Sequence, residues 1–212
     1  MFDAVPLQAP SGISPYNPLV VALVLVAAGA AVSAVYVFRE ARGTHEPGDR
    51  ESFAWLFGLI GGIALLISGE IFWANWAGFP AAQYTELFGV AETLYATVML
   101  AAAFVIYRGL DPKPLAWITS FAGVILLQGA HAILSFELTL QPIVSAGIWI
   151  AAGVAGVLLL PAAYVDDDSG ARTYLAYGIW VFLVVLAGLT LFMGFEAHFS
   201  HIAEVMAQQG GG

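Results

Sequence analysis

The stretch LVVALVLVAAGAAVSAVYVF, residues 19–38, decides the class of protein, because it runs for 20 residues without a charged side chain. A helix needs about 20 apolar residues to cross the roughly 30 Å hydrocarbon core of a bilayer. Five further apolar runs follow, at residues 53–73, 86–107, 114–136, 143–164 and 173–195, the last continuing as an amphipathic helix to Met206. These runs are continuous rather than alternating, which excludes a β-barrel. The sequence therefore predicts an all-α bundle of six transmembrane helices.

The composition of the whole chain excludes several other classes of protein. Of its 212 residues 60% are hydrophobic and only 10% are charged, whereas soluble domains carry about 25% charged residues. A soluble enzyme and a disordered protein are both excluded by this shortage. Six Lys and Arg against fifteen Asp and Glu give a net charge of −9, so no basic patch exists for nucleic acid. The chain has no Cys, and the partner it implies is the lipid bilayer.

The chain divides into three parts. Residues 1–17 contain no Lys or Arg, and the apolar run that follows is too long for the core of a cleavable signal peptide. We therefore expect residues 1–17 to form an extracellular segment before a six-helix domain at residues 18–207. Residues 208–212 end in three glycines, which predicts a disordered tail.

The positive charges indicate how the helices are oriented. All six fall in the first, third and fifth connections between the apolar runs: Arg39, Arg42, Arg50, Arg108, Lys113 and Arg172. Connections rich in Lys and Arg face the cytoplasm. We therefore expect a multi-pass protein of the cell membrane with these loops cytoplasmic and both termini outside.

A few ionisable residues lie at membrane depth, where they are costly and mark function. On the orientation above, Glu70, Glu92, His131, His198 and His201 all lie toward the outer side. Carboxylate and imidazole groups without thiolates suit zinc, copper or iron. The sequence thus predicts an outward-facing metal site built from these five residues. Haem held by His131 and a C-terminal His is an alternative cofactor.

Helical spacing refines this prediction. His198 and His201 are three residues apart and share a helix face, whereas Glu196 is rotated by about 200° from His198. We expect the face bearing the two histidines to enter the site and Glu196 to point away from it. Glu92 and Tyr95 are likewise three residues apart and share a face of their helix.

Other interpretations stay open at this stage. Glu70 and Glu92 also suit a path for protons or cations, or interhelical hydrogen bonds in an accessory subunit with no site of its own. The GxxxG spacing of Gly58 and Gly62 favours close helix packing, within the bundle, in a homo-oligomer or against other membrane subunits. We expect His45, in the first loop, to be solvated. No motif fixes a reaction, so the sequence leaves open whether the protein is an enzyme.

One family resembles this chain. The stretch Tyr84-Thr85-Glu86-Leu87-Phe88-Gly89 and the later turn Tyr107-Arg108-Gly109-Leu110-Asp111 are similar to those of an archaeal and bacterial multi-pass membrane family, domain of unknown function 981. The resemblance covers about residues 50–195. Where the family pattern leads us to expect a Gly-Asp pair, this chain has Gly89-Val90-Ala91-Glu92, which leaves open whether Glu92 replaces the acid. The resemblance implies a membrane protein and carries no activity.

Overall fold

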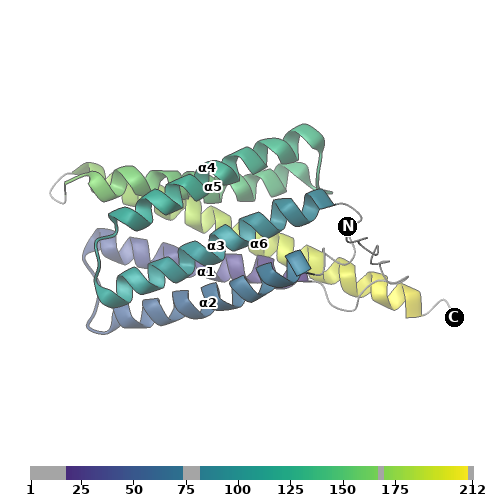
Figure 1. Cartoon of the computed structure of the whole chain (residues 1–212), viewed down its shortest axis with the longest axis horizontal. Coiled ribbons are helices and arrows are strands. Elements are labelled where there is room, and N and C mark those ends of the chain that lie inside the picture. The colour runs from purple at the N-terminus through teal and green to yellow at the C-terminus, as the bar shows by residue number, and fades with distance from the viewer. Residues whose placement is uncertain (1–17, 74–81, 167–169, 210–212) are drawn as a thin grey trace, which may run out of the picture.

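The computed structural model describes residues 18–73, 82–166 and 170–209 of the chain, and it has six long helices there (Figure 1). The six are α1 (Pro18–Arg42), α2 (Asp49–Trp73), α3 (Ala82–Arg108), α4 (Lys113–Phe136), α5 (Pro142–Tyr164) and α6 (Gly170–Gln209). Each is long and apolar enough to cross a membrane, and no strand occurs in the described ranges. The predicted all-α bundle of six membrane-spanning helices is therefore confirmed.

Local sequence explains where the helices begin. Proline lacks an N–H and has a φ suited to a helix, so it is tolerated in the first turn. Pro18 and Pro142 are the first residues of α1 and α5. The predicted extension of the sixth span is also confirmed, because α6 runs unbroken for 40 residues. The expected N-terminal segment at residues 1–17 lies outside the described residues, as does the end of the predicted tail.

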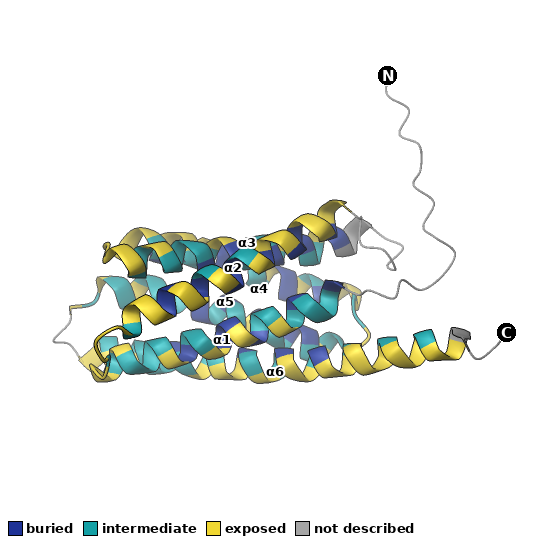
Figure 2. Cartoon of the chain, turned by 90° about the horizontal axis from the view of Figure 1, so that it is seen from below, coloured by how far each residue is buried: buried dark blue, intermediate teal, exposed yellow. Residues whose placement is uncertain are grey.

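The helices form a closed ring in chain order, with α6 returning to pack against α1 (Figures 1 and 2). The pairs α2–α3, α4–α5 and α1–α6 pack most extensively, and α5–α6 follows. The seams between α1 and α2 and between α3 and α4 are looser. Across the ring, the backbones of α1 and α3 approach each other slightly, and side chains of α3 and α5 meet where the rings of Phe88 and Trp149 lie 6.2 Å apart. The ring therefore encloses an interior that the helix backbones do not fill.

Glycines bring some neighbouring helices unusually close. A Cβ atom added at Gly123 of α4 would lie 2.6 Å from the carbonyl oxygen of Gly153 in α5. On α2 the close contact is at Gly61, where an added Cβ would lie 3.0 Å from the backbone nitrogen of Leu100. No atom lies within 4 Å of a Cβ added at Gly62. Within the bundle, Gly62 therefore packs against no neighbouring helix, whereas a Cβ added at Gly58 would lie 3.7 Å from Ala103 of α3.

Large apolar side chains cover the outside of the ring. Leu66 is 75% exposed and Phe121 is 67% exposed, and exposed positions run along the outer surfaces of the helices (Figure 2). Such a surface suits lipid rather than water, because lipid chains are as apolar as these side chains. The protein is thus a multi-pass membrane protein that contacts the bilayer.

The two ends of the bundle carry different charges. One end, called here the cation end, holds all six Lys and Arg residues, at the ends of α1 and α3 and the starts of α2, α4 and α6 (Figure 1). The opposite end, called the acid end, carries carboxylates and no Lys or Arg among the described residues; its acids are Glu70, Glu86, Glu137, Glu196 and Glu204. The C-terminal part of α6 extends beyond the other helices there (Figures 1 and 2).

Candidate functional site: a cavity inside the helix ring

A cavity of about 1030 Å³ lies inside the ring and is lined by side chains from all six helices. Its wall is mainly aliphatic and aromatic, and small residues such as Ala30, Ala122 and Ala152 leave the space open. The cavity extends along the bundle, because its lining includes Arg50 and Arg172 at the cation end and Glu196 and Glu204 at the acid end. Ligand pockets commonly have volumes of about 300–1,000 Å³, so this cavity has room for a small molecule.

Glu92 of α3 is the principal polar group inside this cavity. The residue is only 5% exposed, and its Oε1 atom has no hydrogen-bond partner. It lies ten residues into α3, which is about 15 Å along the helix axis. A buried polar group without a partner costs about 1–3 kcal/mol. The sequence pointed to Glu92 as a functional residue, and its lining position and missing partner agree with that interpretation.

Hydroxyl groups inside the bundle have hydrogen-bond partners, which sets Glu92 apart. Thr93 donates to the carbonyl oxygen of Gly89 at 2.7 Å and lies 2.5 Å from the Ser68 hydroxyl across the α2–α3 interface. Thr190 of α6, which is fully buried, donates to the carbonyl oxygen of Leu186 at 2.6 Å. Unlike these hydroxyl groups, the carboxyl of Glu92 is left available to a ligand.

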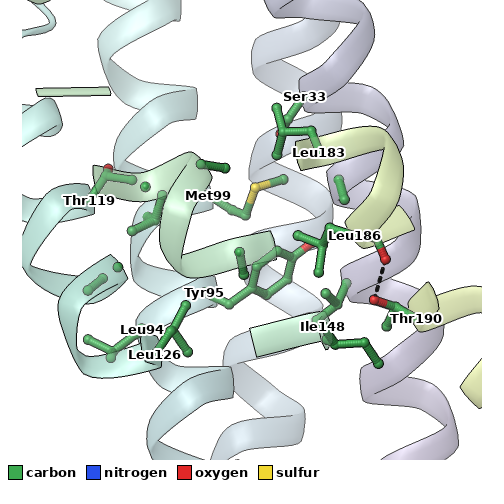
Figure 3. A pocket seen from close by; sticks show the side chains of 18 of the residues that line it. Ser33, Leu94, Tyr95, Met99, Thr119, Leu126, Ile148, Leu183, Leu186 and Thr190 are labelled. Carbon is green, nitrogen blue, oxygen red and sulfur yellow. Dashed lines mark hydrogen bonds between the residues drawn. The ribbon is translucent and has the colours of Figure 1, made fainter. Parts of the chain in front are cut away.

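Tyr95 crosses the cavity one turn further along α3. Its ring reaches toward Leu186 and Ile148 on the opposite wall (Figure 3). Its hydroxyl donates a hydrogen bond of 2.8 Å to the carbonyl oxygen of Leu25 in α1. This bond is possible because Gly29 has no side chain, since an added Cβ there would overlap the Tyr95 hydroxyl. Tyr95 thus links α3 to α1 across the ring.

The acid end of the cavity is polar. Glu196 accepts a hydrogen bond from the side-chain amide of Gln141, which joins α6 to the start of α5. His201 and Glu204 continue this lining along α6, and the His201 Nε2 atom is buried without a hydrogen-bond partner. The carboxylates of Glu196 and Glu204, both on α6, therefore line the cavity at the acid end.

Only two of the five predicted metal ligands, Glu92 and His201, line this cavity. The other three, Glu70, His131 and His198, are exposed and outside the lining. Among the described residues, no group of three or more His, Asp or Glu side chains is placed to hold a metal ion. The transition-metal and haem hypotheses stay predictions that this arrangement of side chains does not support.

The rotation of a helix about its own axis decides which of its residues face the cavity. The stripe of α6 that faces the cavity runs through Met193, Ala197, Ser200 and Glu204, and His198 lies about 100° around the helix from Ala197. Glu196, which we expected to point away from the site, lines the cavity instead. The expectation about which face of α6 enters the site was therefore wrong for His198 and Glu196.

The cation end holds a second polar cluster that the sequence did not predict. The side chain of His45 is only 12% exposed; its Nε2 lies 3.2 Å from a Glu40 oxygen and its Nδ1 lies 3.8 Å from an Asp49 oxygen. Its ring packs 5.0 Å from that of Tyr36, and Arg39 pairs with Asp49 at 2.5 Å. The expectation that His45 is solvated is wrong, because the first loop folds it back onto α1.

The fold, the apolar exterior and the interior cavity define the class of protein: a multi-pass membrane protein whose six helices surround a mainly apolar cavity with one buried, unpartnered carboxyl among the described residues. Residues 15–204 match the model of the family described as "Protein of unknown function (DUF981)". The chain belongs to this family, and the match extends beyond the part that carried the resemblance. No curated protein and no solved structure matches the chain.

Proposed function

We propose that this protein binds a small amphipathic molecule inside the membrane, with the apolar part of the molecule against the cavity wall and its polar group at Glu92. The observation that carries this proposal is the Glu92 carboxyl, which faces a cavity of about 1030 Å³ without a hydrogen-bond partner. A rigid core does not retain such a group for stability, because an apolar side chain of similar volume costs less.

The energetics favour a ligand that is mainly apolar. Burial of apolar surface contributes about 25 cal/mol per Å², and the wall offers Leu126, Ile148, Trp149 and Leu183 for such contact. A hydrogen-bond donor on the ligand would remove the cost of leaving Glu92 unpaired, about 1–3 kcal/mol. The wall therefore supplies affinity for the apolar part, and Glu92 fixes the position of the polar part.

The distribution of charge indicates which end of the bundle faces the cytoplasm. Because the six Lys and Arg residues lie at one end of the bundle, the positive-inside rule puts that end in the cytoplasm of the cell. The acid end, with Glu196 and Glu204, then faces outward, and so do both chain termini. We propose that the ligand reaches the cavity from this outer side.

Photolabelling tests the proposal. The probe is a neutral alkyl diazirine with an amide head group, applied to the full chain in mild detergent, with the labelled peptides identified by mass spectrometry. We expect saturable labelling at cavity positions such as Met99 and Leu126 that an excess of non-photoreactive analogue suppresses. Lipid-facing Leu66 and Phe121 are expected to label without saturation.

A matched pair of variants controls for surface labelling. Ala152 lines the cavity, whereas Ala28 is exposed on α1 and outside the lining. Ala152→Phe fills part of the cavity and is expected to reduce the saturable labelling, while Ala28→Phe leaves it unchanged. Labelling that neither saturates nor responds to Ala152→Phe would remove the proposed function.

A second candidate function is the passage of protons or cations, which is favoured because the cavity lining reaches both ends of the bundle. On this view the carboxyl of Glu92 carries the charge at membrane depth. Flux measured in vesicles is then abolished by Glu92→Gln and kept by Glu86→Gln, which removes an exposed carboxyl of the same helix. Flux that survives Glu92→Gln argues against this candidate.

A further inference from the structure

We propose that the molecule held in the cavity is a hydrophobic organic cation, with its positive charge beside Glu92 and its entry from the acid end. This inference rests on the proposed function and adds to it the charge of the ligand. Three features of the cavity carry it: the distribution of charged side chains along the lining, the missing partner of Glu92, and the aromatic rings of the wall.

The cationic side chains that line the cavity all lie at one end of it, where Glu40 also lies, 3.7 Å from Arg50. Arg50 and Arg172 both lie in the first turns of their helices at the cation end. Glu196 and Glu204 lie at the other end, and among the described residues no Lys or Arg lines that part of the cavity. Glu92 precedes Arg108, the last residue of α3, by 16 residues, or about 24 Å. A cation entering past Glu196 and Glu204 is therefore attracted, and an anion is repelled.

The burial of Glu92 without a partner is a second observation that favours a cationic ligand. It is 5% exposed, its Oε1 atom has no partner, and no cationic side chain of the described residues pairs with it. A positive charge beside Glu92 favours the ionised form of its carboxyl, whereas a negative charge at the same place disfavours that form. The site therefore distinguishes ligands by charge.

An organic cation fits this cavity better than a metal ion does. Metal ions need several oxygen or nitrogen ligands around them, and the described residues hold no such group. A substituted ammonium or phosphonium needs only one counter-charge and an apolar surface. Trp149 and Tyr95 both line the cavity, and the faces of aromatic rings attract such cations.

The test compares two hydrophobic ions of the same shape and opposite charge, tetraphenylphosphonium and tetraphenylborate, as competitors of the neutral photoprobe. Concentrations refer to the ion dissolved in the detergent micelles, which removes the difference in partitioning. We expect the phosphonium to protect Met99 and Leu126 from labelling at a concentration at least about tenfold lower than the borate does, since tenfold corresponds to 1.4 kcal/mol. Glu92→Gln is expected to remove this preference, and Glu86→Gln is expected to keep it.

The outcomes separate this inference from the proposed function. Equal protection by both ions, or protection by the borate alone, overturns the preference for a cation while the saturable labelling by the neutral probe still supports a binding cavity. Absence of saturable labelling overturns both. The comparison of the two ions on the natural sequence tests the preference for a cation even if Glu92→Gln does not fold.

Discussion

The contact between Gly29 and Tyr95 gives a prediction whose magnitude follows from the structure. In Gly29→Ala, the new methyl group would overlap the Tyr95 hydroxyl and lie 2.9 Å from the Met99 Cε atom. Tyr95 must then move, and its 2.8 Å hydrogen bond to Leu25 is lost.

Three contributions set the change in the free energy of unfolding. Overpacking of this kind costs about 1–3 kcal/mol, and a hydrogen bond between membrane helices contributes about 0.6 kcal/mol. Replacing glycine by alanine stabilises a helix by up to about 1 kcal/mol. We therefore expect Gly29→Ala to lower the free energy of unfolding by about 1–3 kcal/mol.

A double-mutant cycle with Tyr95→Phe isolates this contact. Without the hydroxyl, the nearest ring atom to the new methyl group is Tyr95 Cζ at 3.0 Å, so most of the overlap disappears. Gly29→Ala should then cost at least about 1 kcal/mol less in the Tyr95→Phe background than in the natural sequence. The assay is reversible denaturant unfolding in detergent, followed by tryptophan fluorescence. Additive effects of the two substitutions would refute the proposed link between α3 and α1.

Further predictions concern packing and the buried carboxyl. Gly123→Ala should lower the thermal unfolding temperature in detergent, because its methyl group would lie 2.6 Å from the carbonyl oxygen of Gly153. Gly62→Ala should leave this temperature unchanged or raise it, because no atom lies within 4 Å of the added methyl group. A lower unfolding temperature for Gly62→Ala than for Gly123→Ala would show that the α4–α5 contact is misplaced. Glu92→Met should raise the free energy of unfolding by about 1–3 kcal/mol, since it removes a buried unpartnered group, while it lowers saturable photolabelling by a probe with an amide donor. A Glu92→Met variant that is less stable than the natural sequence would mean that the carboxyl has a structural partner.

Much of the fold could be predicted from the sequence, because the physical requirement for crossing a bilayer is simple. A run of about 20 apolar residues marks each helix, and prolines such as Pro18 and Pro142 mark where helices begin. The depth of Glu92 along α3 follows from counting residues, and so does the presence of all six cations at one end. These features depend on position along the helix axis, which the sequence contains.

The remaining features of the fold and of the candidate site depend on rotation about the helix axes and on which helices are neighbours. Gly61 and Gly62 differ by only 100° of rotation, yet only Gly61 packs closely against α3. For the same reason the spacing of residues in α6 predicts His198 rather than Glu196 in the site, whereas Glu196 lines the cavity. His45 was missed because the fold of a short loop onto α1 depends on contacts with Tyr36 and Asp49.

Chemical modification by a hydrophobic carbodiimide tests the central claim most directly, namely that a small hydrophobic molecule reaches the Glu92 carboxyl through the cavity. The reagent reacts with carboxylic acids in apolar surroundings and leaves an adduct that peptide mass spectrometry locates. We predict that Glu92 is modified, that Ala152→Phe slows this reaction at least about tenfold, a change of 1.4 kcal/mol in the barrier, and that Ala28→Phe does not. Modification of exposed Glu70 with Glu92 left unreacted would contradict the account.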